Sequence, residues 1–134
     1  MWLGPVSIAP LLRAFKKFEA FSKHSSTEQE RAGIIQAFAY GYELCWKSMK
    51  RLLEERGRSA YSPREVFRMS ALEGFIQDVD PWFTFLKKRN LTVHTYEEKE
   101  AEQVLSICPL FAKEVKAFLR NIGVHEATHS PEAP

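Results

Sequence analysis

The stretch Thr27-EQERAGIIQAFAYGYELCWKSMKRLLEER-Gly57 decides the fold. Thr27 is followed three residues later by Glu30, which is the capping-box signature of a helix start, and Gly57 is a typical helix stop. No proline interrupts the segment. A helix over 28–56 would be about 43 Å long. Because a compact domain of 134 residues has a radius of gyration of about 14 Å, we predict that this helix is the spine of a bundle.

The long helix has two different faces. One face is a stripe of large apolar residues with the spacing of a core: Phe38, Tyr42, Trp46, Met49 and Leu53. The other is a ridge of small residues at every fourth position: Gly33, Ala37, Gly41 and Cys45. Small residues let another helix approach closely. The pattern leaves open whether the ridge packs inside the bundle or forms a homodimer interface, since both crossings obey the same packing rules.

Apolar residues before and after this helix also recur at three and four positions, and strand-like alternation is absent. A first helix is expected from near Ser7 to the polar break at His24. Its apolar face would be formed by Leu11, Leu12, Phe15, Phe18 and Phe21. The segment Ser62-Pro63-Arg64-Glu65 combines an N-cap, a proline and an acid, which predicts a helix from there to about Leu72 that stops at Gly74.

Two further helices are expected in the second half. Asp80 and Pro81 predict a helix start by the same logic, and the residues on one face of that helix are Trp82, Phe85, Leu86 and Arg89. Thr95 and Glu98 form another possible capping box, so a fifth helix is expected from near Tyr96 toward Ile122. Pro109 should kink or split this helix at Cys108.

These elements predict an all-α fold, an antiparallel up-and-down bundle of four to five helices. It would form one domain over residues 1–122, with a flexible tail over 123–134. The content of 45% hydrophobic and 27% charged residues is that of an ordinary globular protein. Two cysteines and four scattered histidines lack the spacing of zinc ligands, so we expect no bound metal and no cofactor.

The charge and the N-terminus limit the possible location and partners. The chain begins without the features of a signal peptide and has no apolar run of the roughly 18 residues that a membrane span needs. We therefore expect a soluble, cytoplasmic protein. The net charge of +2 is too small to predict binding to a long stretch of nucleic acid, so any anion site must be local.

The most basic stretch of the chain is such a local site. Lys87, Lys88 and Arg89 are consecutive, and His94 lies five residues after Arg89. On one straight helix Arg89 and His94 would point about 140° apart. If one helix ends near Asn90 and the next starts at Thr95, the chain turns and His94 faces Arg89.

That arrangement has a possible chemistry. Arginine binds phosphate bidentately and histidine is a general acid or base near neutral pH, so the pair suits metal-free cleavage of RNA. The acidic residues Glu97, Glu98 and Glu100 at the same helix start would repel a phosphate. The alternative from the residues alone is a solvated basic face, with His94 in a turn and Tyr96 packed.

Four ordered pieces of this chain resemble HEPN domains of the HepT type, also described as nucleotidyltransferase substrate-binding proteins. Residues 89–96 resemble the R-x4-H-x-Y signature of the family, and residues 40–47 resemble the aromatic E-L-x-W-K segment of its long helix. Residues 62–65 resemble its S-P-R-E helix start, and residues 82–94 resemble its W-x-x-x-L-x-x-R-N-x-x-x-H run. The resemblance covers about residues 8–122. One departure is that Ala37 and Ala39 flank Phe38, where relatives often carry an Arg and a Glu.

The resemblance implies a dimeric helical-bundle subunit that pairs with a small, separately encoded nucleotidyltransferase. In such pairs the HEPN protein is a metal-independent RNase toxin, and the nucleotidyltransferase is the antitoxin. Arg89 and His94 would then be the catalytic pair, with Asn90 and Lys88 in support. Tyr96 would be the site of adenylylation. Because nucleotidyltransferase motifs are absent, we do not expect this chain to transfer nucleotides itself.

Two functions of different class, and a third structural one, follow from these observations. The first is an RNase whose cleft forms where Arg89 and His94 of two protomers approach each other. The second is a non-catalytic subunit that presents a nucleotide or another substrate to a nucleotidyltransferase. The third is a dimeric adaptor without a site at Arg89 and His94.

Overall fold

The computed structural model describes residues 2–4, 6–94 and 97–124, apart from the side chain of His94. Within them the chain forms helices α1 (Ala9–Phe21), α2 (Glu28–Glu55), α3 (Pro63–Leu72), α4 (Asp80–Leu91) and α5 (Glu98–Asn121). A single 3-10 turn, η1 (Thr92–His94), joins α4 to α5. A short antiparallel hairpin of β1 (Trp2–Leu3) and β2 (Val6–Ser7) precedes α1, with Trp2 opposite Ser7. The predicted all-α bundle is confirmed, and the hairpin was not expected.

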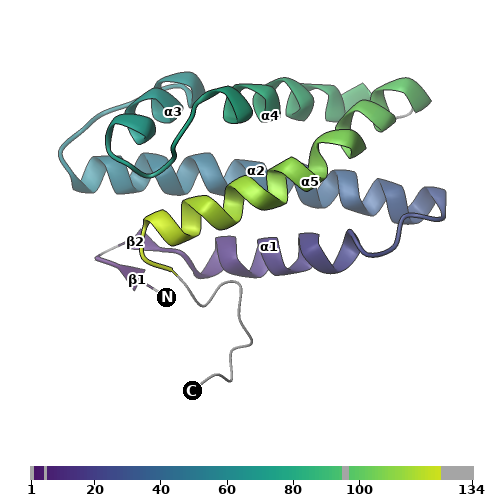
Figure 1. Cartoon of the computed structure of the whole chain (residues 1–134), viewed down its shortest axis with the longest axis horizontal. Coiled ribbons are helices and arrows are strands. Elements are labelled where there is room, and N and C mark those ends of the chain that lie inside the picture. Colours follow the sequence, from purple (N-terminus) through teal and green to yellow (C-terminus); the bar gives the residue numbers. More distant parts are fainter. Residues whose placement is uncertain (1, 5, 95–96, 125–134) are drawn as a thin grey trace, which may run out of the picture.

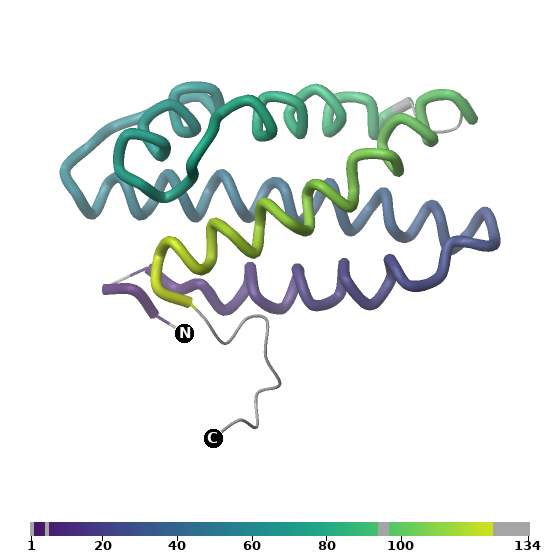
Figure 2. Tube along the Cα trace, viewed as in Figure 1, coloured from purple at the N-terminus to yellow at the C-terminus, as the bar shows by residue number. Residues whose placement is uncertain are grey.

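Helix α2 is the spine of the bundle, as predicted. It runs the length of the molecule and packs against α1, α3, α4 and α5 (Figures 1 and 2). The capping box at its start forms, because Glu30 N–H donates to Thr27 Oγ1 at 3.0 Å and Thr27 N–H donates to Glu30 Oε1 at 2.9 Å. At its other end Gly57 adopts a φ of +77°, a left-handed conformation that suits glycine.

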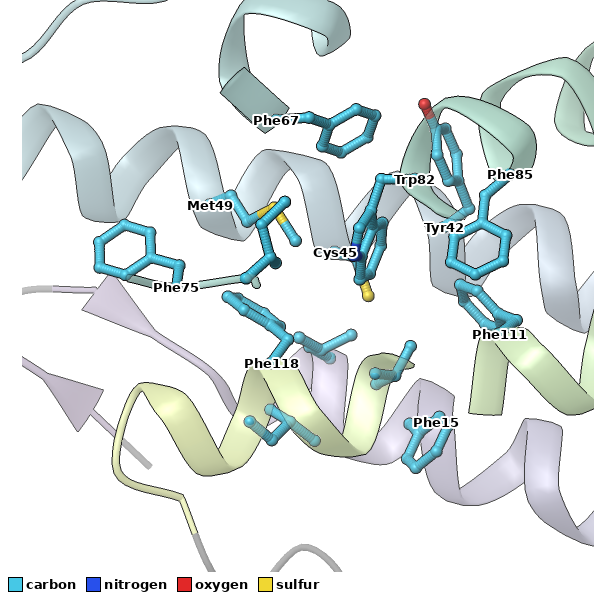
Figure 3. Close-up of a cluster of buried hydrophobic side chains, with 14 of the residues drawn as sticks. Phe15, Tyr42, Cys45, Met49, Phe67, Phe75, Trp82, Phe85, Phe111 and Phe118 are labelled. Atoms are coloured by element: carbon cyan, nitrogen blue, oxygen red, sulfur yellow. The ribbon is translucent and has the colours of Figure 1, made fainter. Parts of the chain in front are cut away.

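The core contains a cluster of aromatic rings, several of which contact Phe111 of α5 (Figure 3). Its ring lies 4.9 Å from that of Phe38 and 5.3 Å from those of Phe18 and Phe85, all in edge-to-face contact. The small ridge of α2 faces other helices of the same chain, since a Cβ on Gly41 would be in van der Waals contact with the Phe111 ring of α5, and one on Gly33 with the Phe21 ring of α1, each at 3.5 Å. The ridge therefore serves close crossings within the chain.

Several helix ends differ from the prediction. Asp80 is the first residue of α4 rather than its cap, because Asp78 Oδ1 accepts the Asp80 N–H at 3.1 Å and Val79 is the N-cap. Helix α5 begins with Glu97 as its N-cap, two residues later than the capping box at Thr95 predicted, and the Glu97 side chain makes no capping hydrogen bond. It also continues through Pro109 as one helix instead of splitting.

The burial pattern departs from the prediction at a few positions. Phe21, predicted on the core face of the first helix, is 39% exposed, and Trp46 is only half-buried. Val124, just after α5, is buried. The remainder of the predicted tail lies outside the described residues. In the part of the chain that the structure describes, no helix combines the length and apolar character needed to cross a membrane.

Candidate functional site

The R-x4-H segment spans the junction between α4 and α5. Arg89 lies in the last turn of α4, which ends at Leu91, and residues 92–94 form η1. This turn packs against α2, α4 and α5. The predicted break in the helix after Asn90 is thus present. The side chain of His94 and all of Tyr96 lie outside the described residues, so the approach of His94 to Arg89 stays a prediction.

The Arg89 guanidinium is held at the seam between α4 and α2. Its Nε atom lies 3.4 Å from Glu43 Oε2, and its Nη1 donates a hydrogen bond to Thr92 Oγ1 at 3.3 Å. Thr92 Oγ1 in turn donates to the Arg89 carbonyl at 2.7 Å. The Nε atom is buried and makes no hydrogen bond within the described residues, so its contact with Glu43 is an ion pair only. The side chain as a whole keeps 30% exposure, so anions in solvent can reach it.

Glu43 is the residue of this site that the sequence reasoning missed. Its Oε1 accepts a hydrogen bond from the Trp46 indole N–H at 3.2 Å, and Lys47 Nζ lies 3.8 Å from the same oxygen. These contacts within one helix fix the carboxylate that orients Arg89. The available signal was an acid three residues before a tryptophan and four before a lysine, which places all three on neighbouring positions of a helix.

The predicted supporting residues lie elsewhere. Lys88 Nζ donates to Gln103 Oε1 of α5 at 3.4 Å, so this lysine faces α5 whereas Arg89 faces α2. Asn90 is exposed on the last turn of α4. Of the described residues predicted for the site, the structure therefore brings only Arg89 to the α2 seam, where it meets Glu43.

Tyr42 lies beneath this seam. Its ring packs against Phe67 at 6.1 Å, and its hydroxyl points out of the aromatic cluster, away from Phe111 (Figure 3). That hydroxyl is buried without a hydrogen-bond partner among the described residues. Burial raises the pKa of Tyr42, and the nearby Glu43 carboxylate raises it further, while Arg89 and Arg64 act in the opposite direction. Tyr42 is therefore a neutral phenol at neutral pH, and the charges of Arg64 and Arg89 both act on its hydroxyl.

Neither cysteine is a candidate nucleophile. Cys45 and Cys108 are buried and unpaired, and burial raises the pKa of both thiols, that of Cys108 to about 12. Thiols in such surroundings are protonated at neutral pH and unreactive. Within the described residues, no cluster of three or more histidine, cysteine or acidic side chains is arranged to bind a metal ion.

Comparison with known proteins places this chain in a family. Residues 7–123 match the family model described as nucleotidyltransferase substrate binding protein like. A protein of Haemophilus influenzae named probable ribonuclease HepT is 36% identical over 78 residues, a match that covers 54% of this chain. The match covers 53% of that relative, so it spans about half of its length.

Two solved structures share the fold closely. A crystal structure of a Thermus thermophilus protein superposes with a TM-score of 0.79 at 26% identity, covering 84% of this chain and 98% of that one. A Haemophilus influenzae structure, described as the fold of a substrate binding domain of a nucleotidyltransferase, gives 0.77 at 28% identity over 87% and 98% of the two chains. The family model extends over nearly the whole described bundle, and the protein belongs to the nucleotidyltransferase substrate-binding-protein-like family, as a member of the HepT type.

Proposed function

We propose that this protein is a metal-independent endoribonuclease, the toxin subunit of a pair with a small nucleotidyltransferase antitoxin. The observation that carries the proposal is the placement of Arg89. Its guanidinium is fixed by Glu43 and Thr92, remains open to solvent, and lies at the turn that leads to His94. The name of the Haemophilus influenzae relative, probable ribonuclease HepT, supports the same activity.

The proposed reaction needs only a phosphate-binding group and a proton carrier. Arg89 holds the scissile phosphate and stabilises the negative charge that develops on its oxygens. The RNA 2′-oxygen attacks phosphorus as His94 takes the 2′-hydroxyl proton, and the bond from phosphorus to the 5′-oxygen breaks. The leaving 5′-oxygen receives a proton, which leaves a 2′,3′-cyclic phosphate and a 5′-hydroxyl.

The partners follow from the same proposal. Two protomers would each contribute Arg89 and His94 to one cleft, since a bundle of this size offers little room for a deep pocket of its own. The nucleotidyltransferase would silence the toxin by adenylylating Tyr96, because the added phosphate and base would occupy the space beside His94. Mass spectrometry of the protein co-expressed with its neighbouring gene tests both ideas at once, by a bound partner and by an adenylyl mass on Tyr96.

The test of the nuclease uses the purified protein alone in EDTA. We expect it to cut single-stranded RNA into fragments with 2′,3′-cyclic phosphate ends, and His94→Ala to slow cleavage by a factor of about 100 or more. His24→Ala is the matched control, because His24 is exposed in the loop between α1 and α2. Wild-type protein that leaves RNA intact under these conditions would overturn the proposal.

A non-catalytic role as the nucleotide-binding subunit of a nucleotidyltransferase is the second candidate. The observation that favours it is a groove of about 480 Å³ beside the site, lined by Ala39 and Gln36 of α2 and by Thr92. Ala39 stands where the family pattern often has a glutamate, so this position contributes no charge to the groove. This role predicts nucleotide binding that Arg89→Ala abolishes, together with no RNA cleavage at any protein concentration.

A further inference from the structure

Two arginines and a phenylalanine form a patch on the surface shared by α3 and α4. The guanidinium carbons of Arg64 and Arg68 lie 5.1 and 5.3 Å from the centre of the Phe83 ring. Both arginines are exposed and are four residues apart on α3, so they share one face of that helix. A guanidinium over an aromatic ring is held in place while its N–H edge stays available for hydrogen bonds. We refer to Arg64, Arg68 and Phe83 as the arginine patch.

The positive charge of this patch is not neutralised. Neither Arg64 nor Arg68 forms an ion pair within the described residues. The neighbouring acid, Glu65, instead accepts the Tyr61 N–H at 3.0 Å at the helix start. By contrast, Arg56 and Arg58 both pair with Glu73 at the other end of α3. The positive charges of α3 that have no ion-pair partner among the described residues therefore lie where this helix contacts Phe83.

The arginine patch lies close to Arg89. The Phe67 ring contacts both Tyr42, at 6.1 Å, and Phe83, at 6.3 Å, and the charges of Arg64 and Arg89 both act on the Tyr42 hydroxyl. Phe83 and Arg89 are separated by about 9 Å along the axis of α4 and point about 120° apart around it. Phosphates of a stacked strand repeat about every 3.4 Å along its axis, so this axial separation alone corresponds to about three nucleotides.

We propose that the arginine patch binds the phosphates of the single-stranded RNA that flanks the scissile phosphate at Arg89. Planar guanidinium groups suit phosphate oxygens, and exposed Lys87, one turn after Phe83 on the same face of α4, adds a further positive charge beside the patch. RNA fits better than an acidic protein surface, because ring contacts from Phe83 through Phe67 to Tyr42 link the patch to the residue next to Glu43, the partner of Arg89. That the bound strand is RNA rests on the proposed function. The test remains distinct, because RNA binding is measured separately from RNA cleavage.

The experiment compares two double variants with the same change in charge. Arg64→Ala with Arg68→Ala removes the patch, and Arg13→Ala with Arg51→Ala removes two exposed arginines of α1 and α2. Each lowers the formal net charge from +2 to 0, because two of the 19 basic residues are lost. Both are made in a His94→Ala background so that RNA stays intact. The probe is a fluorescent single-stranded 12-mer, and its anisotropy is measured over a range of salt concentrations.

The patch variant should bind on the order of 20-fold more weakly at 0.1 M salt, with the slope of log K against log salt smaller by about 1.4, since each phosphate contact contributes about 0.7. The control variant should keep the parent slope. Arg64→Lys with Arg68→Lys keeps the charge and should keep most of the slope, which shows that loss of charge rather than misfolding weakens binding.

Equal slopes and affinities in the two alanine doubles overturn the inference, as does an absence of RNA binding by the parent. The outcome is separable from that of the proposed function. If the wild-type chain binds RNA through the patch but does not cut it, this inference stands and the nuclease fails. If it cuts RNA while the two doubles behave alike, the nuclease stands and this inference fails.

Discussion

Replacing Glu43 with glutamine tests how the site holds Arg89. The change keeps an oxygen for the Trp46 indole N–H and removes the charge that faces Arg89. At 3.4 Å, two unit charges attract by about 5 kcal/mol at an effective dielectric constant of 20 and by about 1 kcal/mol in bulk water. The two side chains are 30% and 31% exposed, so desolvation and side-chain ordering offset most of this attraction. We expect a net coupling of about 1 kcal/mol.

A double-mutant cycle with Glu43→Gln and Arg89→Gln measures that coupling by urea unfolding at neutral pH. The Lys50–Glu54 pair of α2 is the control cycle, with a contact of 2.7 Å on the outside of one helix. Pairs of this kind contribute about 0.3–0.5 kcal/mol. Although its contact is shorter, the control pair should couple more weakly, since it is local and Glu54 is 50% exposed. A Glu43–Arg89 coupling no larger than that of the control would refute the argument that the seam strengthens the pair.

Cleavage kinetics distinguish two roles of the Glu43 carboxylate. It can position Arg89 for catalysis, or it can inhibit by competing with the RNA phosphate for Arg89. If the carboxylate orients Arg89, Glu43→Gln should lower kcat about 10-fold with little change in KM, because the guanidinium loses its alignment with the transition state. If the carboxylate competes with the RNA phosphate, the same variant should cut faster and bind RNA more tightly. The second result would contradict the positioning role.

Two further predictions concern the scaffold. Because burial raises the pKa of Cys45 and Cys108, both thiols should stay unreacted with a thiol-specific dye in the folded protein at pH 8 and react in denaturant; rapid labelling of the folded chain would contradict their burial. Thr27→Ala should lower the free energy of unfolding by about 1 kcal/mol through loss of the cap. The pKa of Glu30 is lowered mainly by the hydrogen bond that its carboxylate accepts from the Thr27 N–H. The carboxylate therefore stabilises the fold above the ordinary glutamate pKa, and this stabilisation is lost as the pH falls through the lowered pKa. Glu30→Gln should therefore destabilise the protein at pH 7 but not at pH 2, as measured by denaturant unfolding at both pH values, and an equal effect at both would be inconsistent with this assignment.

Local signals in the sequence predicted most of the helix boundaries. Thr27 with Glu30 and Ser62 with Glu65 place side-chain acceptors where a helix leaves N–H groups unsatisfied, and both starts are found where predicted. The start of α4 was misplaced by one residue because two aspartates lie near it, Asp78 before the helix and Asp80 as its first residue. Sequence alone does not decide which of them accepts the hydrogen bond.

The site was harder to predict, since its contacts join distant parts of the chain. The basic stretch and the turn after it pointed to Arg89, because both are local in sequence. Its partner Glu43 comes from a different helix, and the pairing depends on how α4 packs against α2. Lys88 shows the converse, because its charge suggested a role beside Arg89 while its position on the helix directs it to Gln103.

Pairing with Glu43 leaves Arg89 able to bind an anion. A guanidinium has five N–H donors in one plane. Glu43 faces Nε and Thr92 accepts from Nη1, so these contacts engage two of the three nitrogens of the group. The remaining donors can meet a phosphate with the plane already oriented, which reduces the entropy lost on binding. The carboxylate also cancels part of the positive charge when no RNA is bound. Because Arg64 and Arg68 have no such counter-ion among the described residues, initial attraction of the RNA falls to them, and Arg89 supplies the geometry at the scissile phosphate.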